Sequence, residues 1–140
     1  EKSGGHNNLR FVETLSDDFD AVVAIDVLEH LDTPLLVLGQ LTNAVREDGI
    51  LIFANCFYPV IKCHLPHTFY LRYFFRYFAK EFGLKFIGRC SYALVYRKES
   101  TVVPNWEKIR RMEIWCQRVF PLIDRLEKVG SKIRKAVLCA

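Results

Sequence analysis

The feature that most constrains the fold is a strand, a helix and a second strand in close succession over residues 19–57. The first segment, FDAVVAI, is an almost continuous apolar run, which is typical of a strand buried on both faces of a parallel sheet. A helix is predicted next, with Thr33 as its N-cap, Pro34 at its first position and its end at Gly49. The second strand, ILIFANCF, follows at once. Such short joints predict a right-handed βαβ crossover and therefore an α/β fold with a parallel sheet.

The segment after this unit predicts one more helix and a pair of strands. A loop that contains proline leads into an aromatic helix over residues 68–83, and strands are predicted over 84–90 and 92–98 as an antiparallel edge pair that closes the sheet. A short earlier strand, LRFVE, is predicted over 9–13. Along one side of the aromatic helix the cations recur every four residues, opposite an apolar side, and they are Arg72, Arg76 and Lys80.

The C-terminal part is a basic amphipathic extension. From Pro104 onward, apolar residues recur at three- and four-residue steps, which predicts one long helix that is broken or kinked at Pro121. The chain's net charge of +4 is concentrated in this segment. We expect a helix packed on the sheet or on a partner, with a solvated basic face. Contact with an anionic membrane surface is the alternative, and no clear nucleic-acid-binding signature is present.

Cysteine usage bears on compartment and on metal binding. The five cysteines are widely spread and form no Cys-x-x-Cys pair, which indicates reduced thiols and a cytoplasmic protein rather than a disulfide framework or a zinc knuckle. No apolar run approaches the roughly 20 residues of a membrane-spanning helix. The first residue is Glu rather than Met, so we expect the chain to be part of a longer protein.

Titratable side chains follow the first buried strand directly. Asp26, Glu29 and His30 come at the point where FDAVVAI stops. In an open parallel sheet, ligands bind in the crevice beyond the carboxyl ends of the strands, so these groups are the candidate functional site. The alternative is structural: Asp26 caps the turn, and Glu29 and His30 are ordinary solvated residues.

The stretch FDAVVAIDVLEHLDTPLLVLGQLTNAVREDGILIFA, residues 19–54, resembles the fourth strand, following helix and fifth strand of class I S-adenosylmethionine-dependent methyltransferases. Residues 67–98, with the joint EFGLKF, resemble more loosely that family's late helix and final antiparallel hairpin. The resemblance implies an incomplete Rossmann-like methyltransferase sheet containing strands 3 to 7 of the family, with the reversed seventh strand between the fifth and sixth. It divides the chain into a partial methyltransferase α/β domain, 1–100, and a helical extension, 101–140.

One departure from the family is large. The family's Gly-rich cofactor loop and its ribose-binding acid have no counterpart here, since the early glycines are only Gly4 and Gly5 and no strand precedes them. The resemblance therefore implies the C-terminal part of a methyltransferase, inactive when alone. A catalytically inactive methyltransferase-like interaction module is the rival interpretation, with a homo-oligomer or another partner covering the incomplete sheet.

The resemblance implies that some residues after the first strand contact the cofactor and that others contact the methyl acceptor. Asp26, Val27 and Leu28 are expected to lie beside the methionine end of S-adenosylmethionine, and Glu29 and His30 to face the methyl acceptor. The acceptor is expected to be a hydroxyl of a small-molecule or lipid-like substrate. His30 is then the candidate base. An equally open interpretation is that His30 only hydrogen-bonds neighbouring backbone.

Two further expectations concern the acceptor and a metal. The loop after the fifth strand overlies the acceptor pocket in this family, which makes Asn55, His64, His67 and Tyr70 candidates for substrate binding, although a structural role is as plausible for each histidine. Acid-x-x-Glu-His is also similar to the metal-binding motif of ubiquinone-pathway O-methyltransferases and small-RNA 2′-O-methyltransferases. By that resemblance Asp26, Glu29 and His30 would hold a divalent ion, with His64 or His67 as a further ligand. Most family members with this sequence need no metal, so the main expectation is none.

Overall fold

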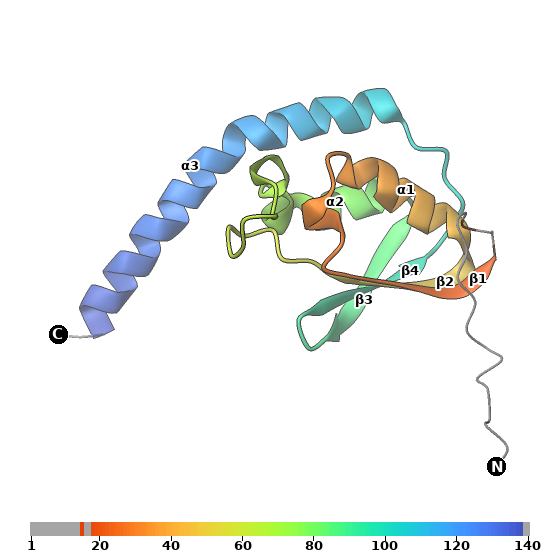
Figure 1. The fold of residues 1–140 in the computed structure, drawn as a ribbon, viewed down its shortest axis with the longest axis horizontal. Coiled ribbons are helices and arrows are strands. Elements are labelled where there is room, and N and C mark those ends of the chain that lie inside the picture. The colour runs from red at the N-terminus through yellow and green to blue at the C-terminus, as the bar shows by residue number, and fades with distance from the viewer. Residues whose placement is uncertain (1–14, 16–17, 139–140) are drawn as a thin grey trace, which may run out of the picture.

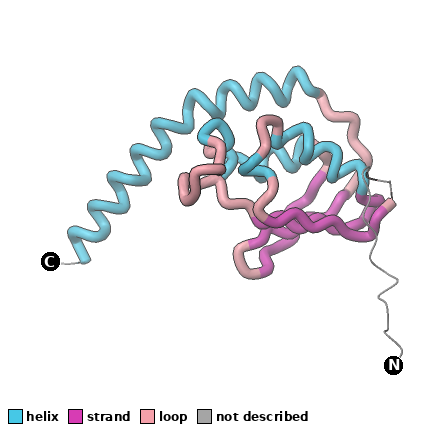
Figure 2. Tube along the Cα trace, viewed as in Figure 1, coloured by secondary structure: helices cyan, strands magenta, loops and turns pink. Residues whose placement is uncertain are grey.

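The computed structural model describes residue 15 and residues 18–138, with side chains described as far as residue 131. These residues form an α/β fold of one mixed sheet and three helices (Figures 1 and 2). The elements in chain order are β1 (Phe19–Ile25), α1 (Pro34–Ala44), β2 (Val45–Ala54), α2 (Leu71–Glu81), β3 (Leu84–Cys90), β4 (Ala93–Lys98) and α3 (Trp106–Leu138). Two 3-10 turns, η1 (Leu28–His30) and η2 (Pro66–Thr68), lie in the connections. The strand predicted over residues 9–13 lies outside the described residues.

The sheet has the order β1-β2-β4-β3. β1 and β2 are parallel, as the βαβ prediction requires, and β4 is antiparallel to both of its neighbours. The predicted antiparallel pair is confirmed, with β4 inserted beside β2 and β3 at the outer edge. The reversed last strand therefore lies between two strands that run in the opposite direction to it.

One face of the sheet is covered by helices and carries the core. α1 and α2 lie on this face, and α3 passes over them (Figure 1). Leu38 of α1 and Phe78 of α2 are completely buried there with Leu51 of β2. The rings of Phe53 and Phe75 meet edge to face with centroids 5.4 Å apart. The predicted amphipathic helices thus bury their apolar sides against the sheet.

The opposite face of the sheet is open among the described residues. Val23 and Ile25 of β1 are 56% and 52% exposed, and only Ala24 of that strand is buried. The prediction that β1 is buried on both faces is therefore wrong for this structure. The physical reason is that no described helix packs on this face and no described strand pairs with the outer edge of β1.

The junction of α1 and β2 also differs from the prediction. The helix ends at Ala44 rather than near Gly49, and Val45 begins the strand. Asp48 adopts a left-handed φ of 62°, and a Cβ on Gly49 would lie 2.4 Å from Cγ1 of Val45, so glycine is required for the sharp bend. Val45 is completely buried, which is why the apolar helical stripe in the sequence runs on to it.

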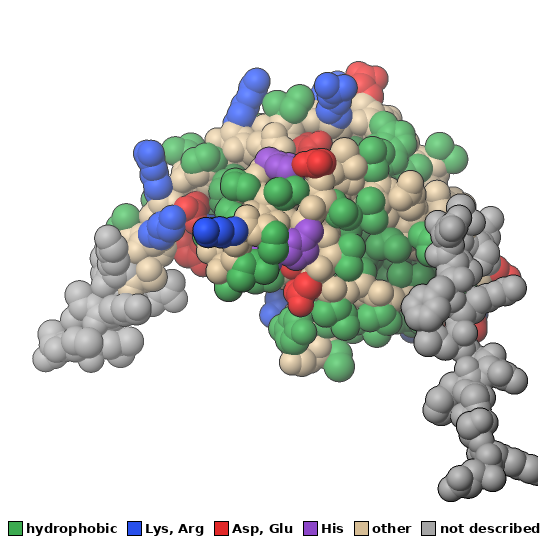
Figure 3. Space-filling model, viewed as in Figure 1, with side chains coloured by type: hydrophobic (Ala, Val, Ile, Leu, Met, Phe, Trp, Pro, Cys, Tyr) green, Lys and Arg blue, Asp and Glu red, His purple; other side chains and the backbone are tan. Residues whose placement is uncertain are grey.

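α3 is continuous through Pro121, so the predicted break is not observed, and the helix curves along its length (Figure 1). Its first turns pack on the domain through buried Ile109 and Cys116. Trp115 and Leu122 of this helix are more than half exposed, and Figure 3 shows basic side chains along it. None of the described helices is long and apolar enough to cross a membrane. Contact of α3 with a membrane surface stays a prediction.

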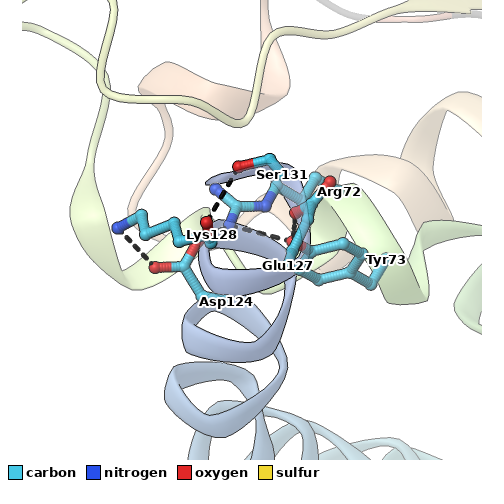
Figure 4. A network of polar contacts seen from close by, with 6 residues as sticks. All are labelled: Arg72, Tyr73, Asp124, Glu127, Lys128 and Ser131. Carbon is cyan, nitrogen blue, oxygen red and sulfur yellow. Dashed lines mark hydrogen bonds and ion pairs between the residues drawn. The ribbon is translucent and has the colours of Figure 1, made fainter. Parts of the chain in front are cut away.

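A polar network joins α2 to α3 (Figure 4). Arg72 donates from Nη2 to Asp124 and to the hydroxyl of Tyr73, and the Tyr73 hydroxyl donates to Glu127. Lys128 is the second cation on Asp124, at 2.7 Å. Hydrogen bonds from Lys128 and Arg72 hold the pKa of Asp124 below its usual value. The Arg72 side chain is only 8% exposed, so this member of the basic side of α2 belongs to the interface with α3.

Candidate functional site

The candidate site begins where β1 turns away from the sheet. Asp26 continues the pairing for one residue, because its N–H donates to the carbonyl of Ala54 at 2.7 Å. Its φ of 50° lies in the left-handed region, which asparagine and aspartate tolerate better than most residues. The chain then enters η1, which carries Glu29 and His30 at the carboxyl edge of the parallel strands. Asp26 itself is exposed.

Glu29 is a buried carboxylate whose two oxygens have different surroundings. Its residue is 0% exposed, and Oε1 accepts a hydrogen bond from the N–H of Cys56 at 2.6 Å. Oε2 is buried and has no hydrogen-bond partner among the residues that the structure describes. None of the ion pairs among the described residues includes Glu29. A buried carboxylate oxygen without a donor or cation is costly, which makes Oε2 a ready acceptor for a ligand.

Two imidazoles lie beside this carboxylate, and backbone carbonyls set the tautomer of each. Nδ1 of His30 lies 3.1 Å from the carbonyl of Cys63, and Nδ1 of His64 lies 2.7 Å from the carbonyl of Tyr58. A carbonyl only accepts, so both Nδ1 atoms donate, and in the neutral ring Nε2 keeps a lone pair. The two rings meet edge to face with centroids 4.9 Å apart.

Glu29, His30 and His64 together fit a divalent cation. Each offers a ligand atom, and the three atoms lie within 4.8 Å of one another. Ligands about 2.1 Å from an ion are roughly 3–4 Å apart, so a small contraction would complete the site. An Nδ1–H bonded to a backbone carbonyl is the usual support of a metal-binding histidine. His64 thus takes the place that the sequence gave to Asp26, which is not in this group.

The remaining predicted site residues are spread more widely. Leu28 is completely buried in the core, while Asp26 and Val27 stay open at the sheet edge. His67 is exposed, with Nε2 at 3.2 Å from the carbonyl of Asp32. The hydroxyl of Tyr70 donates to a carboxylate of α3, and burial together with that hydrogen bond raises its pKa. The predicted cofactor and acceptor residues therefore do not form one continuous surface.

For S-adenosylmethionine, the described residues supply only one side of a pocket. Asp26 and Val27 are available at the carboxyl edge, but Gly4 and Gly5, the early glycines of the chain, lie outside the described residues. A cofactor of this size needs an opposite wall with hydrogen-bond partners for its ribose and amino acid ends. Residues 18–138 alone do not fit it.

The sequence offered Asn55 as a site candidate but did not reveal that the backbone of residues 55–58 supports the candidate site. The N–H of Cys56 holds Glu29, and the carbonyl of Tyr58 holds His64. Side chains of the same segment line a cavity, among them Asn55, whose Oδ1 is buried and unpaired. Backbone groups leave no residue-type signature, so only the loop's position after β2 could have pointed to it.

Comparison of the chain with known proteins gives no match to any family model, to any curated protein or to any solved structure.

Proposed function

We propose that this chain is the C-terminal part of an S-adenosylmethionine-dependent methyltransferase that acts on a hydroxyl of a small-molecule or lipid-like acceptor. The observation that carries the proposal is the polar cluster of Glu29, His30 and His64 at the carboxyl edge of parallel β1 and β2. The cluster lies in a sheet whose reversed strand, β4, is between β2 and β3. This order agrees with the resemblance of the sequence to class I methyltransferases. Ligands of open α/β sheets bind at this edge.

The chemistry asked of this chain is modest. Methyl transfer from a sulfonium is an in-line displacement, so the protein has to align the acceptor and remove a proton from a hydroxyl. His30 suits the second task because Cys63 holds its Nδ1–H and leaves the Nε2 lone pair free. Glu29, buried without a cation, favours the positive charge that develops on the neighbouring imidazole.

A divalent cation is compatible with the same residues. Glu29, His30 and His64 would hold it, and it would lower the pKa of a bound acceptor hydroxyl. His64 is buried and fixed by Tyr58, so its lone pair is positioned before any ligand arrives. The acceptor would then lie beside these three side chains whether His30 works as a base or as a ligand.

The test compares two forms of the protein by calorimetry with S-adenosylhomocysteine. The product of the complete reading frame is expected to bind, and the 140-residue chain is expected to bind weakly or not at all, because its described residues form one wall only. Absence of binding to the complete product would contradict the proposal.

A second candidate function has its own supporting observation. The open face of β1, with Val23 and Ile25 more than half exposed, favours an inactive methyltransferase-like module whose sheet is covered by a partner or a second copy. Light scattering coupled to gel filtration tests the second copy. A dimer that Val23→Lys dissociates, together with no cofactor binding by the complete product, would favour this function.

A further inference from the structure

The second half of α3 carries a row of large apolar side chains that the described part of the chain leaves largely uncovered. The members of this apolar row are Trp115, Leu122, Leu126 and Val129, and each is more than half exposed. They are separated by seven, four and three residues, which is the spacing of one side of a helix. Four such side chains in one row differ from the singly scattered apolar residues of an ordinary surface, and they indicate an interaction site.

Arginines lie directly beside the apolar row. Arg118 comes four residues before Leu122, and Arg125 comes four residues before Val129. Side chains four residues apart are neighbours on the surface of a helix. Both arginines are exposed, and neither is in an ion pair among the residues that the structure describes. Cations and apolar side chains therefore alternate along the same stretch of α3.

The acids of α3 are engaged elsewhere. The helix contains nine cations and four acids. Three of the acids, Glu113, Asp124 and Glu127, accept hydrogen bonds from Tyr70 or from side chains of α2. The fourth, Glu107, lies in the first turn, two turns before the apolar row begins. The surface around the apolar row is consequently positive, and its electrostatic complement is an anionic surface.

The combination of apolar and basic side chains favours a lipid surface over other anionic partners. A helix with Trp and Leu beside Arg lies in the plane of a bilayer, with its apolar side chains at the boundary of headgroups and acyl chains. The stems of Arg118 and Arg125 can follow the apolar surface while their guanidiniums reach the phosphates. A nucleic acid would pair with the arginines but leave Leu122 and Leu126 in water.

A second copy of the chain is a poorer occupant for the same reason of charge. Its α3 presents the same positive surface, because its acids are held by its own α2 and Tyr70. Like charges that face each other across an interface oppose association.

We infer that α3 lies on the surface of a bilayer that contains anionic phospholipids. The apolar row enters the boundary between headgroups and acyl chains, and Arg118 and Arg125 contact the phosphates. No described helix is long and apolar enough to cross the bilayer, so the contact is peripheral. Neither the cofactor nor the cluster of Glu29, His30 and His64 takes part, so the inference does not rest on the proposed methyltransferase function.

Co-sedimentation of the 140-residue chain with two kinds of vesicle tests the inference. One kind is pure phosphatidylcholine, and the other contains about one-third phosphatidylglycerol. We expect binding to the anionic vesicles to be at least about tenfold tighter than to the neutral ones. Raising the salt concentration should weaken it, because the arginine contacts are screened.

The contribution of charge is measured with the double variant Arg118→Gln and Arg125→Gln. Its binding to anionic vesicles is expected to be at least about fivefold weaker. The matched control is Arg89→Gln with Arg97→Gln, which removes the same charge from exposed positions on the β3–β4 hairpin. The control is expected to bind like the wild type.

The contribution of the apolar row is measured with Leu122→Ser and Leu126→Ser combined. This variant is also expected to bind anionic vesicles at least about fivefold more weakly, since it keeps every cation but loses apolar area. The matched control, Val23→Ser with Ile25→Ser, removes exposed apolar side chains from the open face of the sheet. It is expected to bind like the wild type.

Tryptophan fluorescence reports the position of the apolar row directly. The chain has two tryptophans, so Trp106→Phe leaves Trp115 as the only one. Its emission is expected to shift to shorter wavelengths when anionic vesicles are added, because the indole leaves water. Circular dichroism establishes whether each variant is folded, and the fluorescence measurement decides by itself if the leucine variant is not.

Three results would overturn the inference. The first is absence of binding to anionic vesicles with no shift of the Trp115 emission. The second is binding that the arginine and leucine variants leave unchanged. The third is a dimer in light scattering that the leucine variant dissociates, since a second copy would then cover the apolar row. All of these measurements are made without S-adenosylhomocysteine, so they are distinct from the test of cofactor binding by the complete product.

Discussion

Two polar clusters in this molecule differ in how their charges are balanced. Where α2 meets α3, the cation of Arg72 faces Asp124, and Lys128 shares the same carboxylate (Figure 4). At the carboxyl edge of β1, Glu29 is more deeply buried than any of these groups, yet within the described part of the chain it pairs with no cation and one of its oxygens has no hydrogen-bond partner. In the first cluster the charges pair with one another. In the second, a carboxylate oxygen and two imidazole lone pairs are left for a ligand.

This difference separates a structural cluster from a candidate binding site. A compensated ion pair at a helix interface fixes the orientation of α3, and removing one member leaves the other uncompensated. An uncompensated carboxylate beside two oriented imidazoles costs stability in the absence of a ligand, and such costs concentrate at binding sites. Mutations should therefore affect the two clusters in opposite directions.

The largest effect is expected at the α2–α3 cluster. Arg72→Met should lower the free energy of unfolding by about 2–4 kcal/mol, because Asp124 loses the more deeply buried of its two cations and the stacking on Tyr58, Tyr73 and Phe120 is lost. Urea denaturation followed by circular dichroism measures this change.

The matched control is Arg76→Met, one turn further along α2, where the guanidinium stacks on Phe86 alone. Its cost is expected to stay below about 1 kcal/mol. Equal costs for the two variants would show that Arg72 has no special structural role.

The second largest effect is expected at alkaline pH, where ionisation of a buried tyrosine lowers the free energy of unfolding. Burial raises the pKa of Tyr96 to about 12, and its hydroxyl has no hydrogen-bond partner among residues 18–138. The unfolded value is about 10, so this contribution to stability is complete below pH 10 and is lost as the pH rises toward 12.

Melting temperatures between pH 8 and 12 test this, with Tyr96→Phe as the comparison. The variant should lose less stability than the wild type above pH 10. Parallel curves for the two proteins would mean that Tyr96 ionises as readily in the folded protein as in the unfolded chain.

The smallest change in stability is expected at Glu29, and its sign is opposite to that expected for Arg72→Met. Glu29→Gln keeps an oxygen for the N–H of Cys56 and removes an uncompensated buried charge. Its free energy of unfolding should be unchanged or higher by up to about 1 kcal/mol. A loss comparable with that of Arg72→Met would place Glu29 among the structural groups.

The sequence predicted the elements of the fold better than their surroundings. FDAVVAI is a strand because of its apolar β-branched run, the parallel β1–β2 pair follows from the short βαβ joints, and the antiparallel β3–β4 pair follows from the hairpin. The place of β4 beside β2 was implied only by the family resemblance. Burial of both faces of β1 was predicted wrongly, because an apolar run does not show whether other elements of the fold cover the strand. The end of α1 was misplaced because Val45 is buried as a strand residue just as it would be in a helix.

At the candidate site, the sequence identified Glu29 and His30 and offered His64 as one of two further ligands. Spacing alone could not choose between His64 and His67, since the choice depends on which loop carbonyl orients which ring. The spacing placed Arg72 on the basic side of its helix with Arg76 and Lys80, but it could not show that α3 packs against Arg72.

The most direct test of the cluster formed by Glu29, His30 and His64 is calorimetric titration of Mn²⁺ and Zn²⁺. The titrations use the 140-residue chain, its Glu29→Gln variant and its His67→Ala control. We predict one ion per chain for the wild type and the control, and at least about tenfold weaker binding for Glu29→Gln. No binding of either ion at millimolar concentration, or equal affinity in all three proteins, would contradict the conclusion that Glu29, His30 and His64 are held ready for a ligand.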